Sequence, residues 1–368
     1  MNTPALLDLS RQYAKYRAEI DQAISNVLAH TKFIMGPEIE ILEQALAAEV
    51  NACHCVSVSS GTHALEIVLR AADIGPGDEV ITTPFTWIST AEVIPLVGAK
   101  AVFADINEST FNLDPEAVEA AITPRTRAII AVGLFGQMPD LESLSKIAKR
   151  HGLLLIEDAA QSFGAVRNGI SSCGAGCVAT TSFFPTKPLG CFGDGGAIFC
   201  NNDAFASKCR AIRTHGGEVR DQHTILGTNG RFDTLQAAVL LAKLPFFREE
   251  LELRRSTAAF YNSHLNLCCS TPLVDAGNTH VYAQYTIRAD HRDTLRKLLG
   301  ESGIPTAIFY PKCLHQQPVF GAVVDGHFPK AEAASREVLS LPIHPFLTDA
   351  EKQSVVDGMQ KCTGTPSF

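Results

Sequence analysis

Short apolar runs alternate with amphipathic stretches through the first two thirds of the chain. Apolar runs of four or five residues that end at polar or glycine-rich turns are typical of buried strands, and apolar residues that repeat every three to four positions are typical of helices. This alternation predicts an α/β fold with a mostly parallel sheet that is covered by helices on both faces. The predicted strands are 55–58, 79–83, 101–105, 128–132, 153–156 and 196–200, and the predicted helices between them are 62–72, 88–97, 115–122, 141–151 and 203–214.

The remaining patterns lie at the two ends of the chain. Two helices, 10–29 and 38–50, are predicted before the first strand. A helical pattern over 234–251 leads to a later region with one strand and three helices, which are 281–287, 292–302, 331–339 and 349–359. Since 368 residues are also too many for one simple core, we predict a large domain over residues 1–245 and a smaller C-terminal α+β domain over residues 246–368.

Composition narrows the class of protein. The net charge of −8 argues against nucleic acid and against an anionic membrane as partners. We see no pattern of a secretory signal and no apolar run of transmembrane length, so we expect a cytoplasmic protein. The eleven cysteines are scattered and lack the paired spacing of a zinc site, which favours reduced, mostly buried thiols and no bound metal.

One lysine lies in unusually apolar surroundings. Lys187 belongs to the stretch SFFPTKPLG, residues 182–190. A lysine that is held among apolar groups has a lowered pKa and can act as a nucleophilic amine, which is the requirement for a Schiff base. We therefore predict that Lys187 is catalytic.

An acid follows the buried strand that precedes this loop. The stretch LLLIED, residues 153–158, ends in Glu157 and Asp158. The carboxyl end of a parallel strand meets the ligand crevice of an α/β sheet, although an acid there could also be solvated or paired with a nearby base. An acid aimed at a pyridine nitrogen and a Schiff-base lysine are together the minimal apparatus for pyridoxal phosphate (PLP).

These two stretches resemble the signatures of a known family. EDAAQS, residues 157–162, and SFFPTK, residues 182–187, are similar to those of the DegT/DnrJ/EryC1/StrS family, whose members are PLP-dependent aminotransferases of nucleotide-linked keto-sugars. The similarity extends from about residue 7 to about residue 361. It implies the aspartate-aminotransferase-like architecture known as fold type I, and a homodimer whose active sites are shared between subunits.

The resemblance also implies which residues hold the phosphate of the cofactor. Gly61 and Thr62 join a predicted strand to a predicted helix, and taken alone they would indicate only the start of that helix. In the family the matching residues bind the phosphate, and Ser182 matches a second phosphate ligand. Asn229 matches an asparagine that reaches the phosphate in the other subunit.

The ring of the cofactor has its own implied contacts. Trp87, the only tryptophan, matches an aromatic residue that stacks on the pyridine ring, where a structural role in the core would otherwise be expected. Asp158 matches the partner of the ring nitrogen, and Gln161 matches the residue beside the ring oxygen. Lys187 matches the lysine that binds the cofactor and moves the proton.

The substrate side of the site is implied by similarity to one branch of the family. Residues 281–288, 304–307 and 340–345 are similar to the branch that aminates UDP-2-acetamido-2-deoxy-3-oxo-D-glucuronate for O-antigen synthesis, with L-glutamate as amino donor. Arg231 matches an arginine that lies beside the substrate in the family as a whole, and Tyr310 and His344 are candidates for further hydrogen bonds to the substrate. Phe309 replaces a histidine that usually lies close to the sugar in relatives.

Three alternatives to this substrate and this activity remain. The first is an aminotransferase of a neutral 3-keto or 4-keto sugar linked to UDP or dTDP. The second is the family's 3-dehydratase branch, which has histidine in place of the lysine and is disfavoured by Lys187. The third is a PLP-binding regulatory protein without catalysis, which would need none of the proton chemistry of Lys187 and Asp158.

Overall fold

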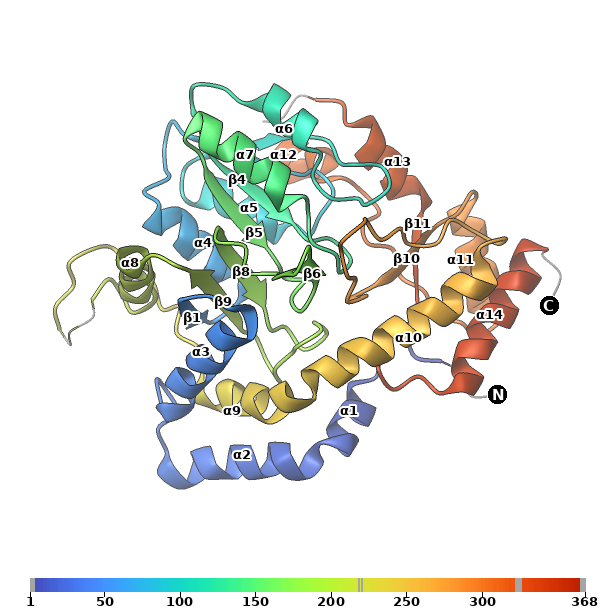
Figure 1. The fold of residues 1–368 in the computed structure, drawn as a ribbon, viewed down its shortest axis with the longest axis horizontal. Coiled ribbons are helices and arrows are strands. Elements are labelled where there is room, and N and C mark those ends of the chain that lie inside the picture. The colour runs from blue at the N-terminus through green and yellow to red at the C-terminus, as the bar shows by residue number, and fades with distance from the viewer. Residues whose placement is uncertain (1–3, 218, 220, 322–325, 365–368) are drawn as a thin grey trace.

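The computed structural model describes residues 4–217, 219, 221–321 and 326–364, and a seven-stranded sheet lies at the centre of this part of the chain (Figure 1). Neighbouring strands are parallel except for β9, which runs antiparallel to both of its neighbours. The prediction of a mostly parallel α/β sheet is therefore confirmed. In spatial order the strands are β1 (His54–Val58), β9 (Gly196–Cys200), β8 (Val178–Ser182), β5 (Leu154–Asp158), β4 (Thr126–Val132), β2 (Glu79–Thr82) and β3 (Lys100–Phe103).

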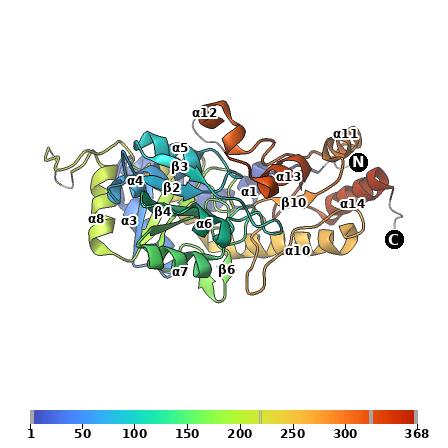
Figure 2. The ribbon, with the colours of Figure 1, turned by 90° about the horizontal axis from the view of Figure 1, so that it is seen from above.

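Helices cover both faces of this sheet (Figures 1 and 2). Because successive side chains of a strand point to opposite faces, each strand contributes to two cores: in β5, Leu155 belongs to one and Ile156 to the other. The helices that share the core of Leu155 are α3 (Pro37–Val50), α6 (Pro115–Ala121), α7 (Leu141–His151) and α9 (Thr234–Lys243). Those that share the core of Ile156 are α4 (Gly61–Ala71), α5 (Ser89–Leu96) and α8 (Asp203–Arg213).

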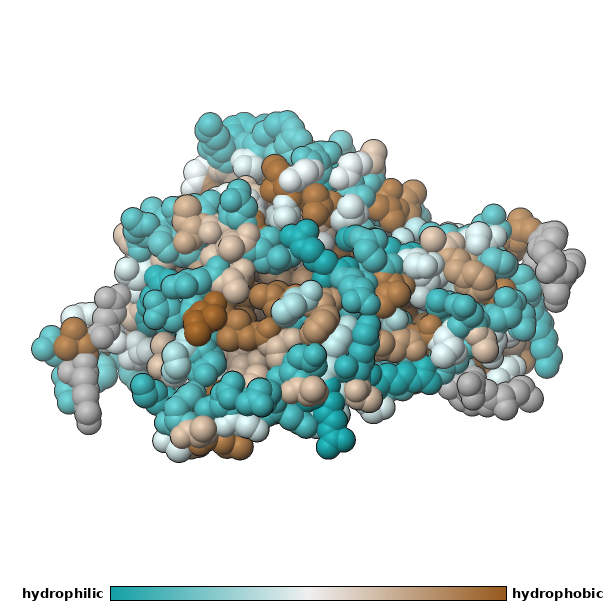
Figure 3. All heavy atoms as spheres, turned by 60° about the horizontal axis from the view of Figure 1, so that its bottom comes forward, coloured by the Kyte–Doolittle hydropathy of each residue, from teal (hydrophilic) through white to brown (hydrophobic). Residues whose placement is uncertain are grey.

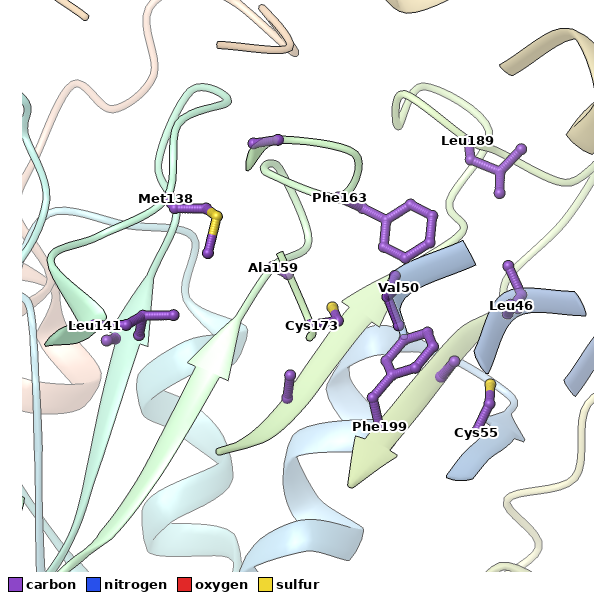
Figure 4. Packing of buried hydrophobic residues seen from close by; sticks show 14 of the residues in the cluster. Leu46, Val50, Cys55, Met138, Leu141, Ala159, Phe163, Cys173, Leu189 and Phe199 are labelled. Atoms are coloured by element: carbon purple, nitrogen blue, oxygen red, sulfur yellow. The ribbon is translucent and has the colours of Figure 1, made fainter. Parts of the chain in front are cut away.

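Aromatic rings fill the first of these cores (Figure 4). The ring of Phe163 stacks on that of Phe199 in β9 with 6.0 Å between centroids, close to Leu46 and Val50 of α3. It also stacks on Phe247, the first residue of α10 (Phe247–Leu265), at 5.6 Å. Stacked rings at these distances stabilise a core beyond the area that they bury. The large core therefore extends into the helix that leaves the sheet.

The small C-terminal region forms on the far half of α10. Its core contains Tyr261 of α10 and Tyr285 of β10, with ring centroids 5.1 Å apart. The strand β10 (Tyr285–Arg288) pairs with β11 (Val338–Leu341) in antiparallel register. The helices of this region are α11 (Arg292–Glu301), α13 (Pro329–Glu337) and α14 (Asp349–Thr363). Two further short elements, η2 (Leu314–Gln316) and α12 (Pro318–Gly321), lie between α11 and α13.

Contacts cross the predicted domain boundary at several points. Residue 245 lies inside the short helix η1 (Leu244–Phe246), which joins α9 to α10. At the N-terminus, Arg11 of α1 (Leu9–Lys15) forms an ion pair of 2.7 Å with Glu351 of α14, so the start of the chain is bound to its end. The division into residues 1–245 and 246–368 stays a prediction.

Three local predictions were wrong in instructive ways. The helix predicted over 10–29 is split into α1 and α2 (Arg17–His30) at Tyr16, whose buried ring stacks on Phe246 with 4.2 Å between centroids. The strand predicted over 281–287 is confined to β10, because the preceding backbone pairs with the large domain: the N–H of Val281 donates to the carbonyl of Gly136.

The third error is the omission of β8. Its sequence, VATTS, has no apolar run, and yet it lies between β5 and β9. The hydroxyl of Thr181 donates to the carbonyl of Ala159 at 3.2 Å, which satisfies a polar side chain inside the sheet. A short hairpin of β6 (Val166–Arg167) and β7 (Ile170–Ser171) was also not predicted.

All eleven cysteines are free, and six of them are buried. Within the described residues, no helix combines the length and the apolar character that crossing a membrane requires.

Candidate active site

A cavity of about 490 Å³ opens where the carboxyl ends of β5 and β8 meet the small domain. Its walls come from the turn before α4, the first turn of α5, the ends of β5 and β8, the loop after β8, and two segments of the small domain. The predicted site residues that line it are Gly61, Thr62, Trp87, Asp158, Gln161, Ser182, Lys187, Phe309 and Tyr310. Residues separated by up to 249 positions, from Gly61 to Tyr310, thus share one cavity.

Asp158 ends β5 on the side of the sheet that faces α5. Its Oδ2 accepts a hydrogen bond of 2.8 Å from the hydroxyl of Thr90, and its Oδ1 accepts one of 3.1 Å from the N–H of Ala160. Burial raises the pKa of Asp158, and the two donors and the charge of Lys187 oppose this rise. The carboxylate is therefore fixed in orientation by two donors at the bottom of the cavity.

Glu157 lies one residue earlier in the same strand, so its side chain points to the opposite face. There it accepts hydrogen bonds of 2.6 Å from the hydroxyl of Ser172 and 2.8 Å from the N–H of Cys173. Burial raises the pKa of Glu157 to about 7. Of the two neighbouring acids, only Asp158 is available to a ligand in the cavity.

Lys187 reaches the cavity from the loop between β8 and β9. The backbone N–H of Lys187 donates to the carbonyl of Phe184 at 2.9 Å, which closes a tight turn. Burial lowers the pKa of Lys187, and the carboxylate of Asp158 opposes this shift. The amine and the acid therefore influence each other inside one cavity.

The other end of the cavity is suited to a phosphate. Helix α4 begins at Gly61, and its first N–H groups have no partner within the helix, which makes such an end a binding site for anions. A Cβ added to Gly61 would lie 2.7 Å from the Cβ of Ser182, so glycine permits the helix and β8 to approach each other. The hydroxyl of Thr62 is hydrogen-bonded to that of Ser89 at 2.8 Å.

A hydrogen-bonded wall stands on the small-domain side. Gln161 accepts a hydrogen bond of 2.9 Å from the N–H of Phe135 and donates one of 3.3 Å to the hydroxyl of Tyr310. The ring of Tyr310 lies 6.2 Å from that of Trp87 and 5.9 Å from that of Phe309. Burial raises the pKa of Tyr310, so its hydroxyl stays protonated and can donate.

Three of the predicted site residues do not line the cavity. Asn229 is exposed and forms a bridge with Thr214, next to the end of α8, after which the chain extends outward in a long loop (Figure 1). Arg231 follows it, and its Nε is buried without a hydrogen-bond partner among the described residues. His344 is buried in the small domain, where its Nδ1 accepts a hydrogen bond from the N–H of Phe346 and burial lowers its pKa to about 4.

The structure adds residues that the sequence did not indicate. Thr90 and Gln284 both line the cavity. Thr90 occupies the first turn of α5, three residues after Trp87, and nothing in the local sequence sets it apart. Gln284 is brought in by the pairing of its N–H with the carbonyl of Phe135, at 3.2 Å, which no local pattern announces.

The donor set fits PLP. An anion-binding helix start, a tryptophan at the wall, a buried carboxylate and a lysine of lowered pKa surround one cavity. In PLP the phosphate would bind the helix start, the aromatic ring would lie against the tryptophan, the ring nitrogen would pair with the carboxylate, and the aldehyde would meet the lysine.

Comparison with curated proteins gives two highly similar relatives. The chain is 49% identical over 347 residues to the UDP-2-acetamido-2-deoxy-3-oxo-D-glucuronate aminotransferase of Pseudomonas aeruginosa, covering 94% of this chain and 96% of that protein. It is 48% identical over 363 residues to a pleiotropic regulatory protein of Geobacillus stearothermophilus, covering 97% of each chain.

Solved structures and a family model agree with this. The crystal structure of DesV from S. venezuelae superposes with a TM-score of 0.97 at 38% identity and covers the whole of both chains. The model of the DegT/DnrJ/EryC1/StrS aminotransferase family matches residues 14–360. The chain therefore belongs to this family, and it is a fold-type I aminotransferase whose cofactor is PLP.

Proposed function

We propose that the protein transfers the amino group of L-glutamate to the 3-keto carbon of a UDP-linked uronic acid. The best candidate is UDP-2-acetamido-2-deoxy-3-oxo-D-glucuronate, which would give the 3-amino uronate for O-antigen and lipopolysaccharide synthesis. The support is the 49% identity to an aminotransferase of that substrate over nearly the full length of both chains. The eleven free thiols suit a reducing compartment, and we propose a cytoplasmic location.

One observation carries the chemistry: Lys187 and Asp158 line the same cavity, at whose other end helix α4 begins. When bound, PLP supplies a carbonyl for the amino group and a ring that withdraws electrons from the reacting carbon. Gly61, Thr62 and Ser182 would hold the phosphate. A cofactor held there by its phosphate would have Lys187 in the same cavity.

The remaining roles concern the ring and the proton. Asp158 would hold the proton at the ring nitrogen, because an ionised carboxylate favours the charged form of its partner. Trp87 would cover the ring, and Gln161 would donate to the ring oxygen. The amine of Lys187 would take a proton from the donor carbon and return it, which its lowered pKa favours.

We further propose a homodimer in which Asn229 and Arg231 complete the site of the partner subunit. Neither lines the cavity of its own chain, and Arg231 has an unpartnered Nε. Beside them lies an exposed apolar loop, residues 33–35, whose Ile34 forms a bridge with Asp233. Apolar side chains also gather around a hollow on the face shown in Figure 3. Contiguous exposed apolar surface is typical of an interface.

Phe309 favours a second candidate function. It lines the cavity and cannot donate a hydrogen bond to a sugar oxygen or a carboxylate. A neutral 3-keto or 4-keto sugar would be accommodated beside it without leaving a charge unpaired.

If the substrate is a uronic acid, another group has to bind its carboxylate. Arg231 is our candidate, because its planar guanidinium can donate two parallel hydrogen bonds to a carboxylate. Tyr310 could donate a further hydrogen bond.

A panel of acceptors tests the proposed function. We expect wild-type enzyme, preloaded with glutamate, to prefer the UDP-linked 3-keto uronic acid to its neutral 6-hydroxymethyl counterpart by about 100-fold or more in kcat/KM. Equal values would favour the neutral sugar.

The Phe309→His variant tests the role of this residue in the choice of acceptor. We expect it to change the KM for the acceptor while the rate of the glutamate half-reaction stays as in wild type. If glutamate fails to change the absorbance of the bound cofactor, the regulatory alternative gains support.

A further inference from the structure

The first turn of α5 contacts both ends of the cavity through two consecutive hydroxyl groups. Thr90 donates to Oδ2 of Asp158 at 2.8 Å, at the end proposed for the ring nitrogen. Ser89 is hydrogen-bonded to the hydroxyl of Thr62 at 2.8 Å, at the end proposed for the phosphate. Trp87 lies at the same cavity, immediately before this turn. One short segment therefore spans the full length of the site.

The two contacts are built in different ways. Thr90 is almost fully buried, at 2% exposure, and its hydroxyl is also 3.3 Å from that of Thr86. Ser89 donates to Glu92 at 3.1 Å, which leaves its oxygen to accept from Thr62. Thr90 therefore donates a hydrogen bond to an acid that titrates, whereas Ser89 is hydrogen-bonded to a hydroxyl that does not. Only the loss of Thr90 should change how the site responds to pH.

We propose that Thr90 and Ser89 are positioning residues: Thr90 keeps Asp158 oriented and ionised toward the ring nitrogen, and Ser89 fixes Thr62 for the phosphate. The charged or titratable groups that face Asp158 are Lys187 and Tyr310 in the cavity, with Glu157 on the opposite face. None of them replaces Thr90, because no other side chain within the described residues donates a hydrogen bond to Asp158. The proposal rests on the assignment of Asp158 and Thr62 to the cofactor.

Thr90→Val tests the first half, since it keeps the shape of the side chain and removes the donor. Without the donor the charged form of Asp158 loses stabilisation, so we expect the pH titration of the absorbance of bound PLP to move up by about one unit, which is a tenfold change in the protonation equilibrium. Thr90→Ser should restore the wild-type curve. If Thr90→Val does not fold, Thr90→Ala offers the same loss of donor without a β-branched side chain.

Ser89→Ala is the matched control from the neighbouring position. We expect it to weaken PLP binding to the apoprotein by about tenfold, measured by fluorescence titration, and to leave the absorbance titration where it is in wild type. An unshifted curve in Thr90→Val, or an equal shift in both variants, would overturn the proposal. No amino donor or sugar is present in either measurement, so a wrong choice of substrate leaves the result unaffected.

Discussion

At the scale of single residues, desolvation acts in opposite directions on the two central groups of the cavity. Burial raises the pKa of Asp158 and lowers that of Lys187, so it favours the neutral form of each. Each charge also opposes the shift of the other. A lysine with a lowered pKa is available as a free amine nearer to neutral pH, which is the form that attacks a carbonyl.

Lys187→Ala should abolish turnover and leave the fold intact, because it removes the amine and touches little of the core. We expect kcat to fall by at least about 1,000-fold, measured as amino-sugar formation, with an unchanged melting temperature of the apoprotein. Lys208→Ala is the control, since Lys208 forms an ion pair with Asp73 outside the cavity. Activity within tenfold of wild type would contradict the assignment of Lys187.

Glu157 gives a prediction about pH. Its pKa is about 7 in the folded chain, against about 4.3 for an unperturbed glutamate. Between these values the folded chain binds more protons than the unfolded chain, so the free energy of unfolding falls as the pH rises through this window. The cost to folding of ionising the buried Glu157 is therefore absent below about pH 4 and fully present above about pH 7.

We therefore expect Glu157→Gln to gain stability relative to wild type as the pH is raised from about 5 to about 8. Denaturant unfolding at several pH values measures the difference. The control is Glu142→Gln, because Glu142 is exposed and pairs with Lys146 at the surface. For this variant we expect the plot of unfolding free energy against pH to run parallel to that of wild type. A Glu157→Gln curve parallel to wild type would mean that the acid titrates normally in the folded chain.

Single residues were predictable where their chemistry conflicts with their surroundings. Lys187 and Asp158 stand out because a charge among apolar residues needs a reason. Thr90 does not stand out, because a threonine in an amphipathic stretch is ordinary until its partner is known. His344 was chosen for its similarity to one branch of the family, and the structure buries it beyond the lining of the cavity.

At the scale of elements, the start of α4 depends on one close approach. The backbone of Gly61 passes so near to Ser182 that an added Cβ would lie 2.7 Å from its Cβ. The Cα of Ser182 lies 3.3 Å from the same point, and neither atom can move without the backbone, so the helix or β8 has to shift. The contact therefore links the geometry of two elements that are far apart in sequence.

Gly61→Ala should cost about 1–3 kcal/mol of stability, as overpacked sites do, and should weaken PLP binding. Thermal unfolding and fluorescence titration with PLP measure the two effects. Gly300→Ala in α11 is the matched control, because nothing lies within 4 Å of its added Cβ, and alanine is the better helix former. An unaltered affinity for PLP in Gly61→Ala would place the phosphate elsewhere.

Elements were predictable where their sequences carry a period. The helix over residues 141–151 and the strand over residues 196–200 have the predicted bounds. Strand β8 was missed because its threonines bond to neighbouring backbone, which is visible only once β5 is in place. The break at Tyr16 likewise depends on Phe246, more than two hundred residues away.

At the scale of the whole molecule, the proposal that two subunits share their active sites makes a specific prediction. Mixed subunits of Lys187→Ala and Arg231→Ala, each inactive alone, should recover activity. Each heterodimer has one site with both residues intact, so an equal mixture should reach about a quarter of wild-type activity if subunits pair at random. Activity is measured after subunit exchange has been demonstrated by differently tagged chains.

A wild-type mixture treated in the same way is the control for losses during exchange. No recovery despite exchange would place Arg231 in the site of its own chain, or away from the chemistry. The architecture and the cofactor followed from the sequence and its family resemblance, whereas the role of Arg231 in a partner subunit stays a proposal that the sequence of one chain does not signal locally.

Helix α10 has a consequence for how the chain could be divided. Phe247 and Leu251 at its start belong to the large core on one face of the sheet, and Tyr261 and Leu265 at its end belong to the small core. A fragment that stopped at residue 245 would lose the ring that stacks on Phe163 and would expose apolar surface to water. We infer that the two regions melt together, and that amide protons along α10 exchange with solvent only when the entire chain opens.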